Sequence, residues 1–94
     1  MIGVKQLSSG DPLEYEVVVR EGAGESRHRV TISKDAWVRL TSRQFTPEQL
    51  ISASFQFLLD REPKESILGS FDLMVISRYF PEYEQELQKY LARS

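Results

Sequence analysis

The side chains that could perform acid–base or nucleophilic chemistry are few and scattered along this chain. His28 is the only histidine among 94 residues, and there is no cysteine. A single histidine cannot build a His-based zinc site. His28 alternates with Val30 and Ile32, which is typical of a half-buried strand residue rather than of a general base. The remaining candidate nucleophiles are serines that lie outside any nucleophile-elbow motif: Ser52, Ser54, Ser66, Ser70 and Ser77.

The glycines do not form a phosphate-binding loop, and the clustered acidic residues do not form a catalytic pair. Gly22-Ala23-Gly24 lacks the Lys-Ser/Thr ending of a phosphate loop, and it joins two predicted strands instead of a strand and a helix. Asp60, Glu62 and Glu65 alternate with basic residues, a pattern typical of a solvated surface with weak ion pairs. We therefore expect no catalytic residue, no cofactor and no metal ion, and an enzyme is the least favoured interpretation.

The charge of the chain is acidic overall but basic in its middle. The net charge is −2 and the pI about 5.4, which gives no global attraction for nucleic acid. Residues 20–43 nevertheless carry six basic against three acidic side chains, a local charge of +3. This excess has two interpretations, the solvated outer face of a hairpin or a surface for an anionic partner. The candidate residues for such a surface are Arg20, Arg27, Arg29, Arg39 and Arg43.

Targeting and membrane signals are not apparent in the sequence. The first residues, Met1-Ile2-Gly3-Val4-Lys5, do not form the apolar stretch of a signal peptide. No apolar run approaches the roughly 20 residues that a membrane span needs. We therefore predict a cytoplasmic protein that does not interact with membranes.

The element that organises the chain is a helix predicted to begin at Pro47. Thr46 is a good N-cap, Gln49 lies at the position that completes a capping box, and proline is favoured at the first helical position. Pro63 is expected to stop the helix, because the residue before a proline is pushed out of the helical region. Its wide apolar face indicates burial on more than one side.

The residues before this helix predict strands, and those after it predict mainly helices. Residues 13–20 and 27–32 alternate apolar and polar side chains, which indicates a hairpin joined by the longer loop Glu21–Ser26. Residues 1–7 could add a third strand. Short helices are predicted at 34–41 and 64–68 and a final helix after Pro81, whereas the run 71–80 fits a helix or a strand. The fold class is therefore α+β: one small domain over residues 1–94, in which an antiparallel hairpin or three-stranded meander (1–33) is covered by three to four helices (34–94).

The predicted core takes residues from both halves of this domain. We expect it to contain Val17, Val30, Ile32, Trp37, Leu50, Phe55, Leu58, Leu59, Leu87 and Leu91. Several aromatic side chains remain beyond what a domain of this size covers easily, and exposed apolar patches usually mark interfaces. Two alternatives follow, a homodimer and a monomer in which these rings are buried. The candidate interface residues are Phe57, Tyr79, Phe80 and Tyr83.

Two parts of the chain resemble known proteins. Residues 29–62 loosely resemble a ribbon-helix-helix unit, in which a strand, a short helix and a capped second helix dimerise to place paired strands in the DNA major groove. In that resemblance Arg27, Arg29 and Thr31 match the outward strand positions, although residues 15–20 compete as the strand's partner. Residues 57–83 look like short bacterial proteins of unknown function, which implies a bacterial source and no activity.

Two functions of different classes follow from these patterns. The first is a small non-enzymatic protein-interaction module, with an exposed apolar patch as its expected mark. The alternative is a nucleic-acid-binding regulator that uses the basic hairpin, and its expected mark is salt-dependent binding.

Overall fold

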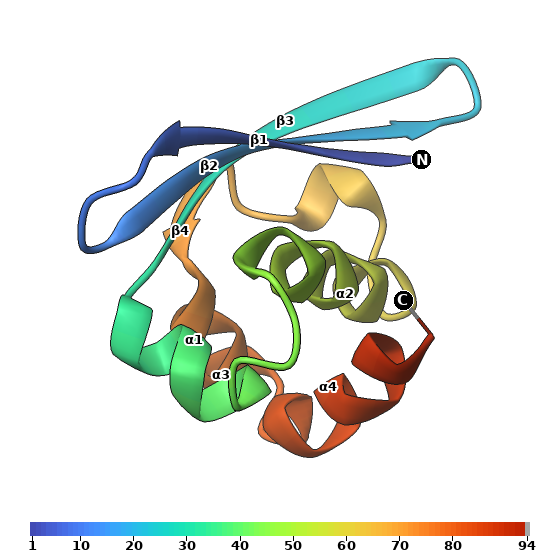
Figure 1. Cartoon of the computed structure of the whole chain (residues 1–94). Helices are drawn as coiled ribbons and strands as arrows, with labels where there is room; N and C mark the ends of the chain where they lie inside the picture. The colour runs from blue at the N-terminus through green and yellow to red at the C-terminus, as the bar shows by residue number, and fades with distance from the viewer. Residues whose placement is uncertain (94) are drawn as a thin grey trace.

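A meander of three antiparallel strands opens the chain: β1 (Ile2–Ser8), β2 (Leu13–Glu21) and β3 (Gly24–Ile32). The computed structural model describes residues 1–93 (Figure 1). Tyr15, Val17 and Val19 of β2 point into the core, opposite the inward residues of β3. The alternation in the sequence therefore predicted this hairpin and its buried face correctly.

The hairpin turn is shorter than the predicted loop. Glu21 pairs with Gly24, so the turn contains only Gly22 and Ala23. Gly22 has a φ of 58°, as the first position of a type II′ turn requires. The prediction of a longer loop over residues 21–26 was wrong because Glu25 and Ser26 belong to β3.

A fourth strand, β4 (Ser70–Asp72), lies parallel to β3 and completes a sheet of order β1-β2-β3-β4. The backbone N–H of Arg29 donates to the carbonyl of Gly69 at 2.8 Å, and the Thr31 hydroxyl donates to the Asp72 carboxylate at 2.8 Å. β3 pairs with β2 of the same chain along its whole length, and β4 covers its other edge at Arg29, Val30 and Thr31, so the strand is not available for the two-chain pairing of that family. This arrangement contradicts the ribbon-helix-helix resemblance.

The ambiguous run after Gly69 contains both kinds of structure. β4 is followed directly by a 3₁₀ turn, η2 (Leu73–Val75), and by the short helix α3 (Ile76–Tyr79). The helical part begins later than Ser70, because the side chain of Asp72 accepts the N–H of Met74 and caps η2. A strand of three residues is too short to show a period of its own.

The two helices that follow β3 begin at the residues predicted from the sequence. α1 (Lys34–Thr41) is capped by Ser33, and α2 (Pro47–Leu59) is capped by Thr46. Thr46 and Gln49 form the capping box, with distances of 3.1 and 2.8 Å. α2 ends at Leu59, so a loop separates it from Pro63.

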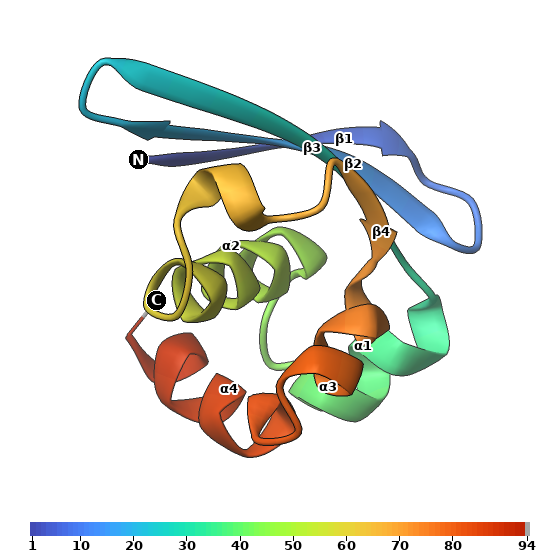
Figure 2. The same cartoon turned by 180° about the vertical axis from the view of Figure 1, so that it is seen from behind.

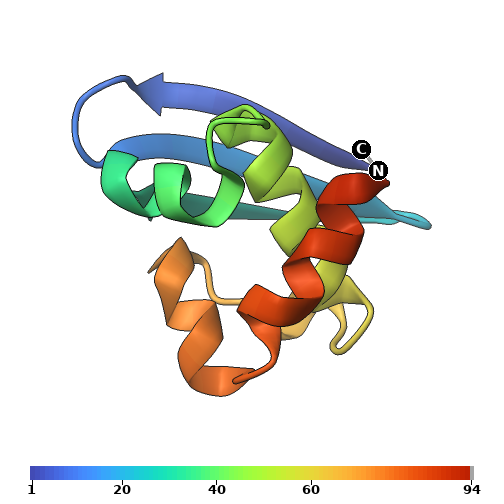
Figure 3. The same ribbon diagram turned by 60° about the horizontal axis from the view of Figure 1, so that its bottom comes forward.

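The chain ends in a helical layer that covers one face of the sheet (Figure 1). A 3₁₀ turn, η1 (Lys64–Ser66), follows α2. α4 (Tyr83–Ala92) packs against α2 (Figure 3), on the side away from the sheet (Figure 1). α2 is therefore enclosed between the sheet and α4. The α+β class and the three-stranded meander under helices are confirmed.

The predicted core is largely correct. All of its residues are buried except Trp37 and Leu59, which are partly buried at its margin. Trp37 stays at the margin because its indole N–H donates to the carbonyl of Phe45 at 2.8 Å. A tryptophan side chain is usually placed so that its one polar atom finds such a partner.

Candidate functional site

The five arginines of the predicted anionic-partner surface do not lie on one face. Arg20 is on β2 and Arg27 and Arg29 are on β3, whereas Arg39 is on α1 and Arg43 lies in the loop after it. α1 belongs to the helical layer that covers one face of the sheet (Figure 1). Arg27 and Arg29 are exposed and alternate along β3 with buried residues, so they lie on the opposite, open face. The arginines thus form two separate groups.

The arginines of β3 are paired with carboxylates of β2. Arg27 lies 3.5 Å from Glu16, and Arg29 lies 3.2 Å from Glu14, both as diagonal neighbours across the hairpin. Opposite charges at such positions attract, although exposed pairs contribute little to stability. The outer face of the hairpin is therefore a ladder of alternating charge and not a basic patch.

Two further arginines of the group are also paired. Arg20 binds Glu25 at 2.9 Å, and its hydrogen bond holds the pKa of the Glu25 carboxyl below the usual range. Arg39 binds Glu84 at 2.7 Å. Within residues 1–93, Arg43 is the one arginine of the five that has no carboxylate at ion-pair distance.

Two residues of the predicted interface are core residues. Phe57 and Tyr83 have no exposed surface, because α2 is covered by the sheet on one side and by α4 on the other. The Phe57 ring meets Phe80, Tyr83 and Tyr90 edge-on, at centroid distances of 5.7, 5.3 and 5.8 Å. The expectation that Phe57 and Tyr83 face a partner was therefore wrong. Both rings are buried within the monomer, as the alternative interpretation stated.

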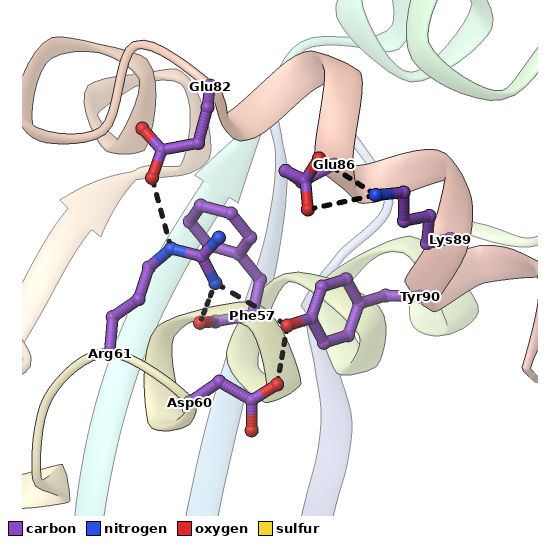
Figure 4. A network of polar contacts seen from close by, with 7 residues as sticks. All are labelled: Phe57, Asp60, Arg61, Glu82, Glu86, Lys89 and Tyr90. Atoms are coloured by element: carbon purple, nitrogen blue, oxygen red, sulfur yellow. Dashed lines mark hydrogen bonds and ion pairs between the residues drawn. The ribbon is translucent and has the colours of Figure 1, made fainter.

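A polar network closes the end of α2 over the Phe57 ring (Figure 4). The Arg61 guanidinium lies 3.6 Å above the ring centroid and donates to the Phe57 carbonyl and to Glu82, each at 3.2 Å. The Tyr90 hydroxyl donates to Asp60 at 2.5 Å. The network ties α4 to α2, so we assign it a structural role.

The carboxylates near Pro63 differ in their partners. Asp60 accepts from Tyr90, and Glu65 binds Lys64 at 2.8 Å, a hydrogen bond that lowers the pKa of Glu65. Glu62 lies between them in sequence and is half-buried. No cation within the described residues pairs with Glu62, which distinguishes it from its neighbours.

Glu62 lies on the wall of a concavity, an apolar groove of about 330 Å³. Its walls come from the end of α2, from η1 and β4, and from η2 and α3, the yellow to orange segments of Figure 2. Leu68 and Tyr79 on this groove are 48% and 68% exposed. We call this site the α2–α3 groove; its lining residues are Leu58, Glu62, Ser66, Ile67, Leu68, Phe71, Val75, Ile76, Tyr79 and Phe80.

Tyr79 and Phe80 of the predicted interface therefore line an accessible surface, unlike Phe57 and Tyr83. Sequence reasoning did not identify Glu62, Leu68 or Phe71 as members of the same site. Their side chains come together only when β4 pairs with β3 and carries α3 beside the end of α2. The one local signal was Leu68, an apolar residue that is next to Gly69 in a turn and has no helical or strand period to bury it.

His28 supports this groove instead of forming a catalytic pair. Its Nδ1 lies 2.7 Å from the carbonyl oxygen of Leu68, and its Nε2 lies 2.8 Å from the Ser26 hydroxyl. A serine and a histidine at this distance are the first two parts of a nucleophilic site. The ring is 4% exposed and packs on Phe55 at a centroid distance of 5.3 Å, so a substrate cannot reach it. His28 thus holds the groove-lining segment against β3.

Comparisons with known proteins add no assignment. No family model, curated protein or solved structure matches this chain significantly. Within residues 1–93, no cluster of three or more His, Cys, Asp or Glu side chains could hold a metal ion. None of the helices described is both long and apolar enough to cross a membrane.

Proposed function

We propose that this protein is a small non-enzymatic interaction module that binds an apolar segment of a partner protein in the α2–α3 groove. The observation that carries the proposal is the exposure of Leu68 and Tyr79 around a concave apolar surface. Soluble proteins usually bury such side chains, and contiguous exposed apolar patches mark interaction sites. A cytoplasmic location remains a prediction.

The size of the groove favours a short segment over a second copy of the chain. A volume of about 330 Å³ accepts one or two apolar side chains, at the lower end of the roughly 300–1,000 Å³ of ligand sites. A stable dimer usually buries about 1,200–2,000 Å² in total. In a two-fold dimer whose axis passes through the groove, two concave surfaces would meet. A second copy of the chain is therefore the competing occupant.

The test is a selection from a random peptide library displayed on phage against the immobilised protein. We expect enrichment of peptides with large apolar side chains, loss of their binding in Leu68→Glu and Tyr79→Glu, and retention in Leu7→Glu. Leu7 is a matched control because it is 42% exposed on β1, away from the groove. Peptides that bind all three variants equally would place the binding site elsewhere.

Light scattering across a dilution series tests the competing occupant. We expect a monomer mass from low to high micromolar concentrations. A dimer that dissociates in Leu68→Glu but not in Leu7→Glu would show that a second copy fills the groove, and would replace the proposal of a foreign partner.

The alternative, a nucleic-acid-binding regulator, has less support. Arg20, Arg27 and Arg29 are each engaged by carboxylates, so a phosphate backbone would have to compete with these pairs. If the hairpin binds nucleic acid, binding must weaken steeply with salt because counterions are released. A gel shift at low salt that is lost in the double variant Arg27→Ala/Arg29→Ala would favour this alternative.

A further inference from the structure

We infer that the partner segment carries a lysine or arginine beside its apolar anchor, and that Glu62 recognises this cation. The inference rests on the proposed function, since it concerns the same groove. It adds the chemistry that distinguishes the right partner from other apolar segments.

The first observation is that Glu62 forms no ion pair, whereas the acidic residues near it each have a partner. Asp60 accepts from Tyr90, Glu65 binds Lys64, and Glu82 binds Arg61. Glu62 lines the groove and has no ion pair within residues 1–93. A cation from outside can therefore bind Glu62 without displacing one of these pairs.

The nearest arginine in sequence is not free to neutralise Glu62. The Arg61 guanidinium is stacked on the Phe57 ring and shares its N–H groups among Glu82, the Phe57 carbonyl and the Tyr90 hydroxyl. These contacts hold it on the α4 side of α2. The charge of Glu62 consequently remains directed at whatever fills the groove.

The second observation is the apolar setting of this carboxylate. Glu62 is half-buried beside walls that include Leu58, Ile67 and Phe80. An apolar anchor that enters the groove removes water from Glu62, and a buried charge without a partner is costly. The cost is offset when the same segment brings a cation, and it remains when the segment is neutral or acidic. The groove therefore favours segments that carry a cation and disfavours neutral or acidic segments.

The aromatic walls suit the same cation. Phe71, Tyr79 and Phe80 line the groove together with Glu62. A lysine or arginine side chain has an apolar stem that packs on such rings and a charged head that is attracted to their faces. The aromatic walls thus suit the apolar stem of such a side chain, and the carboxylate of Glu62 suits its charged head.

The experiment repeats the phage selection with charge variants of the groove. The baits are the wild type, Glu62→Gln, Glu62→Arg and, as the control, Glu65→Arg, because Glu65 is an exposed acid outside the groove lining. We expect the wild type and Glu65→Arg to select peptides with lysine or arginine within four positions of a large apolar residue. Glu62→Gln should lose this preference, and Glu62→Arg should select aspartate or glutamate instead.

A synthetic peptide from the wild-type selection then gives the magnitude. Replacing its lysine or arginine by glutamine should weaken binding to the wild type about tenfold, near the lower end for a hydrogen bond to a charged group, and should not change binding to Glu62→Gln. Melting curves of each bait establish that it is folded. Glu62→Gln tests the charge without a new cation in the groove.

The two levels of the proposal fail in different ways. If no bait selects a peptide whose binding depends on Leu68, the proposed function is wrong. If such peptides are found but their charge preference is the same for the wild type and Glu62→Arg, the groove binds partners and the role of Glu62 is overturned.

Discussion

The Nδ1 atom of His28 lies 2.7 Å from the carbonyl oxygen of Leu68, although the two residues are 40 positions apart in sequence. A carbonyl only accepts hydrogen bonds, so this nitrogen carries the proton and donates it. Nε2 lies 2.8 Å from the Ser26 hydroxyl, with which it shares a second hydrogen bond. One buried side chain thereby links β3 to the groove-lining Leu68.

The first prediction concerns this link. His28→Leu should lower the free energy of unfolding by about 1–3 kcal/mol, because the Leu68 carbonyl and the Ser26 hydroxyl lose their buried partner. Urea unfolding measures the change. Ser26→Ala is the matched control and should cost less, since it leaves the donation to Leu68 intact. An unchanged midpoint for His28→Leu would show that the link is not needed.

The second prediction concerns the start of α2. Thr46→Ala should cost roughly 1 kcal/mol, the usual loss of an N-cap. Thr46→Ser keeps the hydroxyl that accepts from Gln49 and should remain close to the wild type in the same denaturant series. Equal losses in both variants would mean that the methyl group of Thr46 matters and the cap does not.

The third prediction concerns Phe57. Phe57→Ala should lower the free energy of unfolding by about 3–5 kcal/mol, as expected for a large buried ring, and Phe57→Glu should not fold. Circular dichroism and denaturant melts report both effects. The control is Tyr79→Ala, whose side chain is 68% exposed and whose cost should lie within about 0.5 kcal/mol. A folded Phe57→Glu protein would show that Phe57 is not needed in the core and would favour its assignment to an interface.

The fourth prediction is a dependence of stability on alkaline pH. Burial, and then the charge and hydrogen bond of Glu48, raise the pKa of Tyr15 to about 12. The raised value favours the neutral hydroxyl in the folded state. Its contribution to stability is complete below about pH 10, the ordinary tyrosine pKa, and is lost as the pH rises toward 12.

Urea unfolding at several alkaline pH values tests this dependence. Above pH 10 the free energy of unfolding of the wild type should fall more steeply than that of Tyr15→Phe. Glu48→Gln removes the neighbouring charge and should lower the pKa of Tyr15, as phenolate absorbance will report. Parallel slopes for wild type and Tyr15→Phe would contradict the assignment.

The fifth prediction is a gain of stability. The hydroxyl of Ser77 is buried and has no hydrogen-bond partner within the described residues. Ser77→Ala removes an unsatisfied polar atom and improves helix propensity, so it should raise the free energy of unfolding by about 1 kcal/mol. Thermal melts measure the shift, and Ser52→Ala on α2 serves as a helical comparison. A loss of stability in Ser77→Ala would indicate an ordered water on the hydroxyl.

Features set by neighbouring residues were predictable from the sequence. The capping box of Thr46 and Gln49 depends on a spacing of three residues, and the two faces of the hairpin depend on alternation. Both are local rules that act before any tertiary contact forms. Leu87 and Leu91 of α4 were also placed correctly in the predicted core.

Features set by register and layering were not predictable in this way. The pairs Arg27–Glu16 and Arg29–Glu14 depend on the short Gly22-Ala23 turn, which shifts the register relative to a longer loop. The burial of Phe57 depends on α4 covering the second side of α2. The groove required β4, a three-residue strand whose pairing with β3 has no periodic signal in the sequence.

The parallel pairing of β4 with β3 also affects the order in which the chain assembles. The contact between Thr31 and Asp72 closes a loop of 41 positions, whereas the meander before it contains only neighbours in sequence. Loop closure over such a distance costs chain entropy before any contact compensates for it. We therefore expect the wall that β4 and α3 give to the groove to form after the meander. A bound segment that touches both walls would bridge this late contact, so occupancy would slow its opening and prolong the lifetime of the complex.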